Sequence, residues 1–163
     1  MRDHVDLVLE QWARQRPDLD TAPMAVLGRL SRLVRLVEAR QQATFARHGL
    51  DAPSFDVLAT LRRSDPPHEL TPGRLAAASM VTSGAVSQRL DRLEARGLVT
   101  RRRGDVDTRT VLVSLTAAGR AAVEAVLPDH LETGRRALAP LADADVDRLA
   151  RLLRELLAAQ EAG

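Results

Sequence analysis

The stretch "TPGRLAAASMVTSGAVSQRLDRLEARGLVTRRRGDVDTRTVLVSL" (residues 71–115) changes its hydrophobic period from helical to alternating at Gly97. Threonine followed by proline predicts the start of a helix, because threonine caps helices and proline fits their first turn. Apolar residues at every second position after the glycine predict two strands around a polar tip. The expected elements are a helix through Ser79, a tight turn over 80–82, a helix over 83–96, and strands over 99–103 and 110–115. This order predicts a winged helix-turn-helix, in which the hairpin (residues 99–115) is the wing.

The second predicted helix has a buried and an exposed face. Val86, Leu90 and Leu93 recur at helical spacing and form an apolar stripe, whereas Gln88 lies opposite. Small hydroxyl and amide side chains near the start of such a helix can reach base edges in a major groove. A plain helical hairpin would explain the helices, but neither the strands nor the local charge. The DNA-contacting residues expected from the turn and this helix are Thr82, Ser83, Ser87, Gln88 and Arg92.

Positive charge is concentrated in the middle of the chain. Every basic residue except histidine is an arginine, and residues 62–110 carry ten arginines against six acids. Residues 1–61 are balanced, and residues 111–163 carry two more acids than arginines. A local excess of this kind indicates an anion-binding surface, so we expect double-stranded DNA as a partner. Within the wing, Arg102, Arg103 and Arg109 are expected to contact DNA, and Asp107 to hold Arg109 in place.

Several function classes are excluded or disfavoured by composition. There is no cysteine, so thiolate redox sensing and cysteine-ligated metals are excluded. The four histidines lack metal-ligand spacing, and neither a glycine-rich phosphate loop nor a nucleophile motif is present. We therefore expect no enzyme activity, no cofactor and no metal. No apolar run reaches membrane-spanning length, which favours a cytoplasmic protein that does not contact the membrane.

The remaining pattern is helical, and its apolar stripes exceed what one small core can cover. A second copy is the natural cover, so we expect a homodimer. On the last helix the stripe consists of Val146, Leu149, Leu153 and Leu156. Before the helix-turn-helix we expect a helix capped by Asp3 and ending at Gln15, a long helix over 23–48 with Gly49 as its C-cap, a helix from Pro53 to Arg63 and a loop over 64–70. After the wing we expect a helix from the Thr116 cap to Leu138, with a kink at Pro128, and a last helix capped by Asp143.

Two arginines do not fit a DNA-facing position. Strand alternation places Arg101 on the same face as Val99, which should point into the domain. Arg89 lies about 70° from the middle of the apolar stripe of its helix, at the margin of the buried face. A partly buried guanidinium needs a partner, because an unpaired one is costly.

Asp56 and Trp12 are also unusual residues for the positions that they occupy. Asp56 lies in a helix with packed apolar residues, and Trp12 is the only indole of the chain. Taken singly, Asp56 reads as a solvated first-turn carboxylate favoured by the helix dipole, and Trp12 as filler of a dimer interface.

The sequence resembles the MarR family of bacterial transcriptional regulators over nearly its whole length. The specific features are "RLDRLEARGLV" at the end of the second helix, the Asp107–Arg109 pair and "LTAAG" at the entry to the next helix. The resemblance implies a mainly helical single domain with a small β-wing, spanning residues 1–163. About 53–115 would form the DNA-binding core, and 1–50 and 116–163 the helices for dimerisation and a ligand pocket. It further implies an obligate dimer on a pseudo-palindromic operator. A repressor is the expected role, and the residues do not distinguish it from an activator.

Within that family, a urate-responsive branch is similar in carrying an extra N-terminal helix with a tryptophan. The matching ligand positions here are Trp12, Asp56, Arg89 and Arg101. The resemblance implies a small anionic effector, either urate or a carboxylate such as trans-aconitate or citrate, and the residues do not choose between them. The alternative is an architectural DNA-binding protein without a ligand, which would leave these four residues unexplained.

Overall fold

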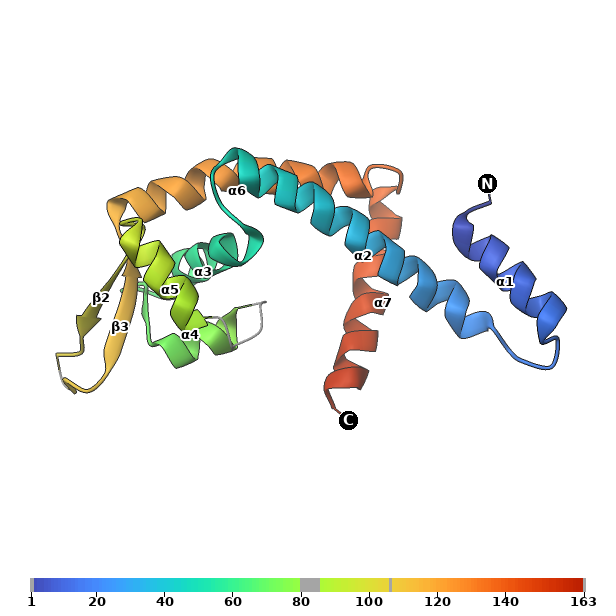
Figure 1. The fold of residues 1–163 in the computed structure, drawn as a ribbon, viewed down its shortest axis with the longest axis horizontal. Coiled ribbons are helices and arrows are strands. Elements are labelled where there is room, and N and C mark those ends of the chain that lie inside the picture. The colour runs from blue at the N-terminus through green and yellow to red at the C-terminus, as the bar shows by residue number, and fades with distance from the viewer. Residues whose placement is uncertain (1, 80–85, 106, 163) are drawn as a thin grey trace. The chain divides into compact units, whose positions relative to one another are not determined.

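A computed structural model describes residues 2–79, 86–105 and 107–162 (Figure 1). Seven helices and three strands lie within these residues, which confirms a mainly helical fold with a small sheet. The chain forms two compact units, Met1–Ala43 and Thr44–Gly163. The elements are α1 (His4–Gln15), α2 (Ala22–Arg47), α3 (Ala52–Arg63), β1 (Glu69–Leu70), α4 (Pro72–Ala78), α5 (Val86–Ala95), β2 (Val99–Arg103), β3 (Val111–Leu115), α6 (Ala117–Leu138) and α7 (Asp143–Glu161).

The N-terminal unit contains α1 and most of α2. Asp3 caps α1 as predicted, because its carboxylate accepts hydrogen bonds from the backbone N–H groups of Val5 at 2.8 Å and Asp6 at 3.0 Å. The Asp6 side chain accepts from the Asp3 backbone in return, which completes a capping box. Among the described residues of α1, Val5 is the one that is buried.

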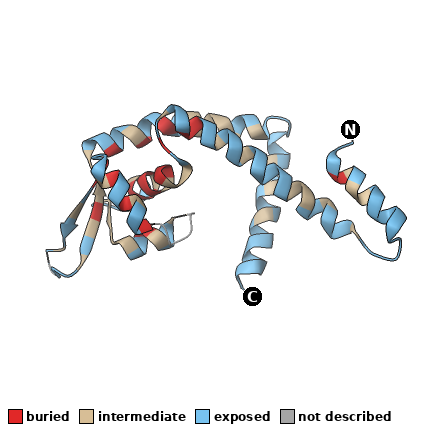
Figure 2. Ribbon diagram, viewed as in Figure 1, coloured by how far each residue is buried: buried red, intermediate tan, exposed pale blue. Residues whose placement is uncertain are grey.

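The C-terminal unit is built around one apolar core, to which α3, α4, α5 and α6 each contribute buried residues (Figure 2). The predicted stripe of α5 is confirmed, since Val86, Leu90 and Leu93 are all buried. Truncating a fully buried leucine of this kind typically costs about 2–5 kcal/mol of unfolding free energy. The core leucines and valines that are at most 2% exposed are Leu58, Leu61, Leu75, Leu90, Leu93, Val57, Val99, Val113, Val123 and Val126.

The wing strands belong to a sheet of three strands in the order β1-β3-β2. β2 and β3 pair antiparallel, with Arg101 opposite Val113 and Arg102 opposite Leu112. The prediction that residues 64–70 form only a loop was wrong, because Glu69 pairs with Ser114 and Leu70 with Val113. Two residues are too few to show an alternating pattern, so this strand is identified only by its backbone pairing with β3.

The entry to α6 is packed closely against the end of the helix-turn-helix. Thr116 caps α6 as predicted, and its hydroxyl also donates to the carbonyl of Gly97 at 2.6 Å. Gly97 has a φ of 68°, in the left-handed region that favours glycine. At Gly119 a Cβ atom would lie 1.8 Å from the carbonyl oxygen of Leu98, so only glycine fits this approach. The "LTAAG" motif is therefore a packing requirement. The helix continues through Pro128.

The last helix begins at the residue that was expected to cap it. Ala142 occupies the N-cap position and no side chain caps the helix, so the assignment of Asp143 as the cap was wrong. None of its described residues is buried, and Leu152, Leu156 and Leu157 are 46 to 60% exposed. Of the helices that the structure describes, none has both the length and the hydrophobicity needed to cross a membrane.

Candidate DNA interface and effector-responsive residues

The outer face of α5 presents polar side chains to solvent. Ser87, Gln88 and Arg92 are exposed, with Gln88 opposite the buried stripe and the other two on its flanks. Side chains of this type can reach base edges and phosphates when such a helix enters a major groove. Two further predicted contacts, Thr82 and Ser83, lie outside the described residues.

The wing tip is closed by Asp107. Its carboxylate accepts hydrogen bonds from the backbone N–H of Arg109 and from the hydroxyl of Thr110, both at 2.9 Å. These two hydrogen bonds, the backbone one being the larger influence, hold the pKa of Asp107 below its ordinary value. Asp107 thus fixes the backbone at Arg109, and the exposed Arg109 guanidinium makes no hydrogen bond or ion pair within the described residues.

The three consecutive arginines of β2 have different environments. Arg101 contacts α5, with Nη1 2.7 Å from a carboxylate oxygen of Asp91 and 3.1 Å from one of Glu94. Its side chain is 27% exposed, in agreement with the prediction that it turns inward. Arg103 is exposed, and its Nη1 lies 3.4 Å from the carbonyl oxygen of Thr108, a weak contact.

Arg102 points to the other face of the sheet, as alternation predicts. Its Nε and Nη2 donate to the two carboxylate oxygens of Glu69 at 2.8 and 2.6 Å, and its Nη1 donates to Asp105 at 3.0 Å. The hydrogen bonds from Arg102 hold the pKa of Glu69 below its ordinary value. The same contacts, that with Glu69 first, raise the pKa of Arg102. We call Arg102, Glu69 and Asp105 the Arg102 cluster.

Arg89 lies at the margin of the core, as predicted. Its side chain is 15% exposed, and Nη1 donates to the carboxylate of Asp51 at 3.2 Å. Burial by itself raises the pKa of Asp51, but hydrogen bonds from Ser54 and the charge of Arg89 outweigh it and leave the pKa below its ordinary value. The Nε atom of Arg89 is buried and has no hydrogen-bond partner among the described residues. A buried donor without a partner is costly, so this position favours an additional acceptor.

The structure does not bring Arg89 and Arg101 together. Arg101 contacts Asp91 and Glu94, which lie on one flank of α5, and Arg89 lies about 170° away around the helix axis at 100° per residue. Asp56 is partly buried in α3, five residues after Asp51.

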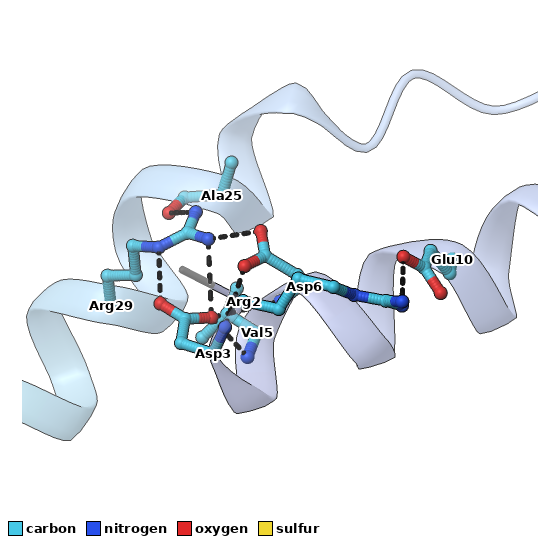
Figure 3. Close-up of polar contacts among 7 residues, drawn as sticks. All are labelled: Arg2, Asp3, Val5, Asp6, Glu10, Ala25 and Arg29. Atoms are coloured by element: carbon cyan, nitrogen blue, oxygen red, sulfur yellow. Dashed lines mark hydrogen bonds and ion pairs between the residues drawn. The ribbon is translucent and has the colours of Figure 1, made fainter.

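Trp12 belongs to the N-terminal unit, so its grouping with the other three residues stays a prediction. Its side chain is 40% exposed. The helix that carries it is held to α2 by Arg29, which binds Asp3 at 2.8 Å, Asp6, and the carbonyl of Ala25 at 3.0 Å (Figure 3).

The acidic partners of these arginines were not predicted from the sequence. Glu69, Asp91, Glu94 and Asp51 all read as ordinary surface acids. For Asp91 and Glu94 a usable signal exists, because they lie three residues apart on one helix flank and next to a wing that carries a surplus of arginine. Glu69 and Asp51 have no such local signal.

The chain is similar to known transcriptional regulators. A model described as "MarR family" matches residues 48–110. The regulator PecS of Dickeya dadantii is 37% identical over 90% of this chain and 88% of its own. Among solved structures, BpsR of Bordetella bronchiseptica, described as regulated in DNA binding by 6-hydroxynicotinic acid, has a TM-score of 0.72 at 29% identity over 80% of this chain and 91% of that one. A MarR variant from E. coli, complexed with operator DNA, has a TM-score of 0.72 at 27% identity over 85% and 99%.

Proposed function

The chain belongs to the MarR family of DNA-binding transcriptional regulators, which are not enzymes, and we propose that it is a repressor released from DNA by a small anion. It binds a pseudo-palindromic operator as a homodimer. The observation that carries the DNA-binding geometry is Arg109, whose backbone N–H is bound by Asp107 at the wing tip and whose guanidinium has no partner within the described residues.

The DNA contacts divide between α5 and the wing. Gln88, Ser87 and Arg92 of α5, the recognition helix, face the major groove. Thr82 and Ser83, which are also predicted to contact DNA, lie outside the described residues. Arg109 enters the adjacent minor groove, and Arg103, which has only a weak backbone contact, reaches a phosphate. Arg102 is set apart from these residues because two carboxylates already bind its guanidinium.

A second copy covers the apolar surface of the C-terminal helices. Leu131 and Leu138 of α6 and Leu152, Leu156 and Leu157 of α7 are 40 to 60% exposed. Large apolar side chains exposed in this number on two helices are typical of a subunit interface. The α5 helices of the two copies then reach successive major grooves, so the operator half-sites lie about one turn of the DNA duplex apart.

The effector is a small anion that recruits Arg89. The support is the buried Nε of Arg89, which has no acceptor among the described residues, next to the 3.2 Å contact of its Nη1 with Asp51. Asp56 of α3 is the predicted acidic partner at this site. The assignment of Trp12 to the same ligand remains a prediction. Arg101 remains a predicted ligand residue, and an anion that binds it must displace Asp91 and Glu94, which loosens the contact between α5 and the wing. Coupling of about 1–3 kcal/mol would lower operator affinity roughly 5- to 150-fold.

Three kinds of anion fit these groups. Urate is flat and accepts hydrogen bonds along its edges, whereas trans-aconitate and citrate offer carboxylates that a guanidinium group can bind through two nitrogens. By likeness to BpsR, an aromatic carboxylate such as 6-hydroxynicotinate is a further candidate.

Selection of duplexes from a random-sequence pool tests the DNA-binding part of the proposal. The parent protein should enrich a two-fold symmetric sequence with half-sites about one helical turn apart. We call this sequence the selected duplex. An architectural DNA-binding protein would enrich no symmetric site, and that result would contradict the proposal.

A further inference from the structure

We propose that Arg102 is a positioning residue, which fixes the wing on the helix-turn-helix so that Arg109 meets the DNA. Arg102 would then not contact DNA itself, although it lies between Arg101 and Arg103 in the most basic stretch of the chain. The inference rests on the proposed contact between the wing and DNA.

The donors of Arg102 are almost fully used within the protein. Of five guanidinium N–H groups, Nε and one on Nη2 bind Glu69 side-on, with both nitrogens matched to separate carboxylate oxygens. Nη1 binds both oxygens of Asp105, at 3.0 and 3.1 Å, and the carbonyl of Arg103 at 3.2 Å. One N–H of Nη2 then remains, whereas a bidentate phosphate contact needs two N–H donors.

The charge of the Arg102 cluster also disfavours a phosphate. Two carboxylates face one guanidinium, so the cluster carries a net charge of −1. A phosphate approaching Arg102 must displace Asp105 or Glu69, and Glu69 is only 16% exposed. The guanidinium of Arg109 is not bound by its neighbour Asp107, because that carboxylate accepts hydrogen bonds from a backbone N–H and a hydroxyl instead.

The cluster joins three parts of the DNA-binding unit. Glu69 lies in β1, two residues before Thr71, which caps α4, the first helix of the helix-turn-helix. Arg102 lies in β2, on the far side of the central strand β3, so its side chain crosses the sheet. Asp105 lies where the wing loop begins. The contacts therefore fix the wing loop relative to the start of α4.

Arg101 supplies a matching contact on the opposite face of β2. It binds Asp91 and Glu94 of α5, so the wing strand is tied to both helices of the helix-turn-helix. Because Arg101 and Arg102 bind the helix-turn-helix from the two faces of β2, the distance between the wing tip and α5 is fixed before DNA binds. A preorganised wing loses less conformational entropy on binding.

Glu69→Gln separates the two possible roles of Arg102 by the sign of its effect. If Arg102 were a phosphate contact, the substitution would free it and remove a negative charge, so the selected duplex would bind more tightly. If Arg102 positions the wing, affinity for the selected duplex should fall about three- to tenfold. Fluorescence anisotropy at about 0.15 M salt, where charges beyond about 8 Å are screened, measures this directly.

Arg102→Lys gives a second, independent comparison. Lysine keeps the charge but cannot bind both oxygens of Glu69 and also reach Asp105, so a positioning role predicts nearly the full loss. A phosphate contact would largely survive. Glu132→Gln is the matched control, because Glu132 is likewise a carboxylate bound by arginine, here by Arg135 and Arg136, but it lies on α6 and not in the wing. It should leave affinity unchanged.

A double-mutant cycle distinguishes positioning from general loss of stability. In an Arg109→Ala background, Glu69→Gln should have little further effect, because the cluster acts through Arg109. An equal loss in both backgrounds, or tighter binding of Glu69→Gln, would overturn the inference while the wing contact stands. If Arg109→Ala itself binds like the parent, the proposed wing contact fails and the inference with it.

Discussion

Replacing Arg109 by alanine removes the arginine that is expected to enter the minor groove. The turn around it should survive, because Asp107 binds the backbone N–H of residue 109 and the hydroxyl of Thr110, and neither depends on the side chain. The variant therefore deletes a DNA contact without unfolding the wing, and its thermal unfolding should match that of the parent.

The size of the effect follows from the two wings of a dimer. If each Arg109 neutralises one phosphate, the slope of log affinity against log salt becomes less steep by about 0.9 per wing, or about 1.8 per dimer. At fixed salt, each lost contact of about 1–3 kcal/mol weakens binding roughly 5- to 150-fold.

Anisotropy titrations with the selected duplex between about 50 and 200 mM salt give both quantities. Arg136→Ala is the control for net charge, because Arg136 is 77% exposed on α6 and binds Glu132 of the same helix. The control should keep the slope of the parent. An Arg109→Ala protein with the slope and affinity of the parent would refute the reasoning.

Three further predictions concern assembly, pH and the N-terminal helix. Charged substitutions at Leu149 and Leu153 of α7 should abolish the dimer and operator binding together, and sedimentation that still shows a dimer would contradict this. Burial lowers the pKa of His130, whose ring lies 5.3 Å from that of Phe45 and 5.0 Å from that of Phe55. The unfolded chain therefore binds a proton at this histidine more readily than the folded chain does. The contribution of neutral His130 to the free energy of unfolding is complete above about pH 6.5 and declines as the pH falls below that value. A Tm difference between the parent and His130→Leu that does not change with pH would exclude this contribution. Arg29→Ala removes the ion pairs with Asp3 and Asp6 that hold α1, so the fluorescence anisotropy of Trp12, the only tryptophan, should fall. Unchanged anisotropy would show that α1 is held by apolar contacts instead.

Local patterns predicted the fold of the DNA-binding unit. The change of period at Gly97 marked the end of the helices and the start of the wing, and the spacing of Val86, Leu90 and Leu93 identified the buried face of α5. The same periodicity correctly placed Arg89 at the margin of the core. These features are set by residues within one or two turns of each other, which is why a sequence reveals them.

Contacts between distant residues were not accessible in this way. Glu69 and Arg102 are 33 positions apart, and their pairing depends on β1, a strand of two residues without a pattern of its own. Strand alternation separated Arg101 from Arg102, but no local pattern showed that Glu69 and Asp105 bind Arg102 whereas Arg103 has only a weak contact. The assignment of Asp143 failed for a different reason, since aspartate is favoured both at the cap and in the first turn of a helix.

The affinity of the parent protein for the selected duplex, measured with and without urate, trans-aconitate, citrate or 6-hydroxynicotinate, tests the central claim most directly. At least one anion should weaken binding about 5- to 150-fold, and DNA should weaken binding of that anion by the same factor. Arg89→Ala should bind the duplex as the parent does and lose most of this response. If no anion changes the affinity, or if Arg89→Ala responds as strongly as the parent, the proposed control by an anion at Arg89 is contradicted.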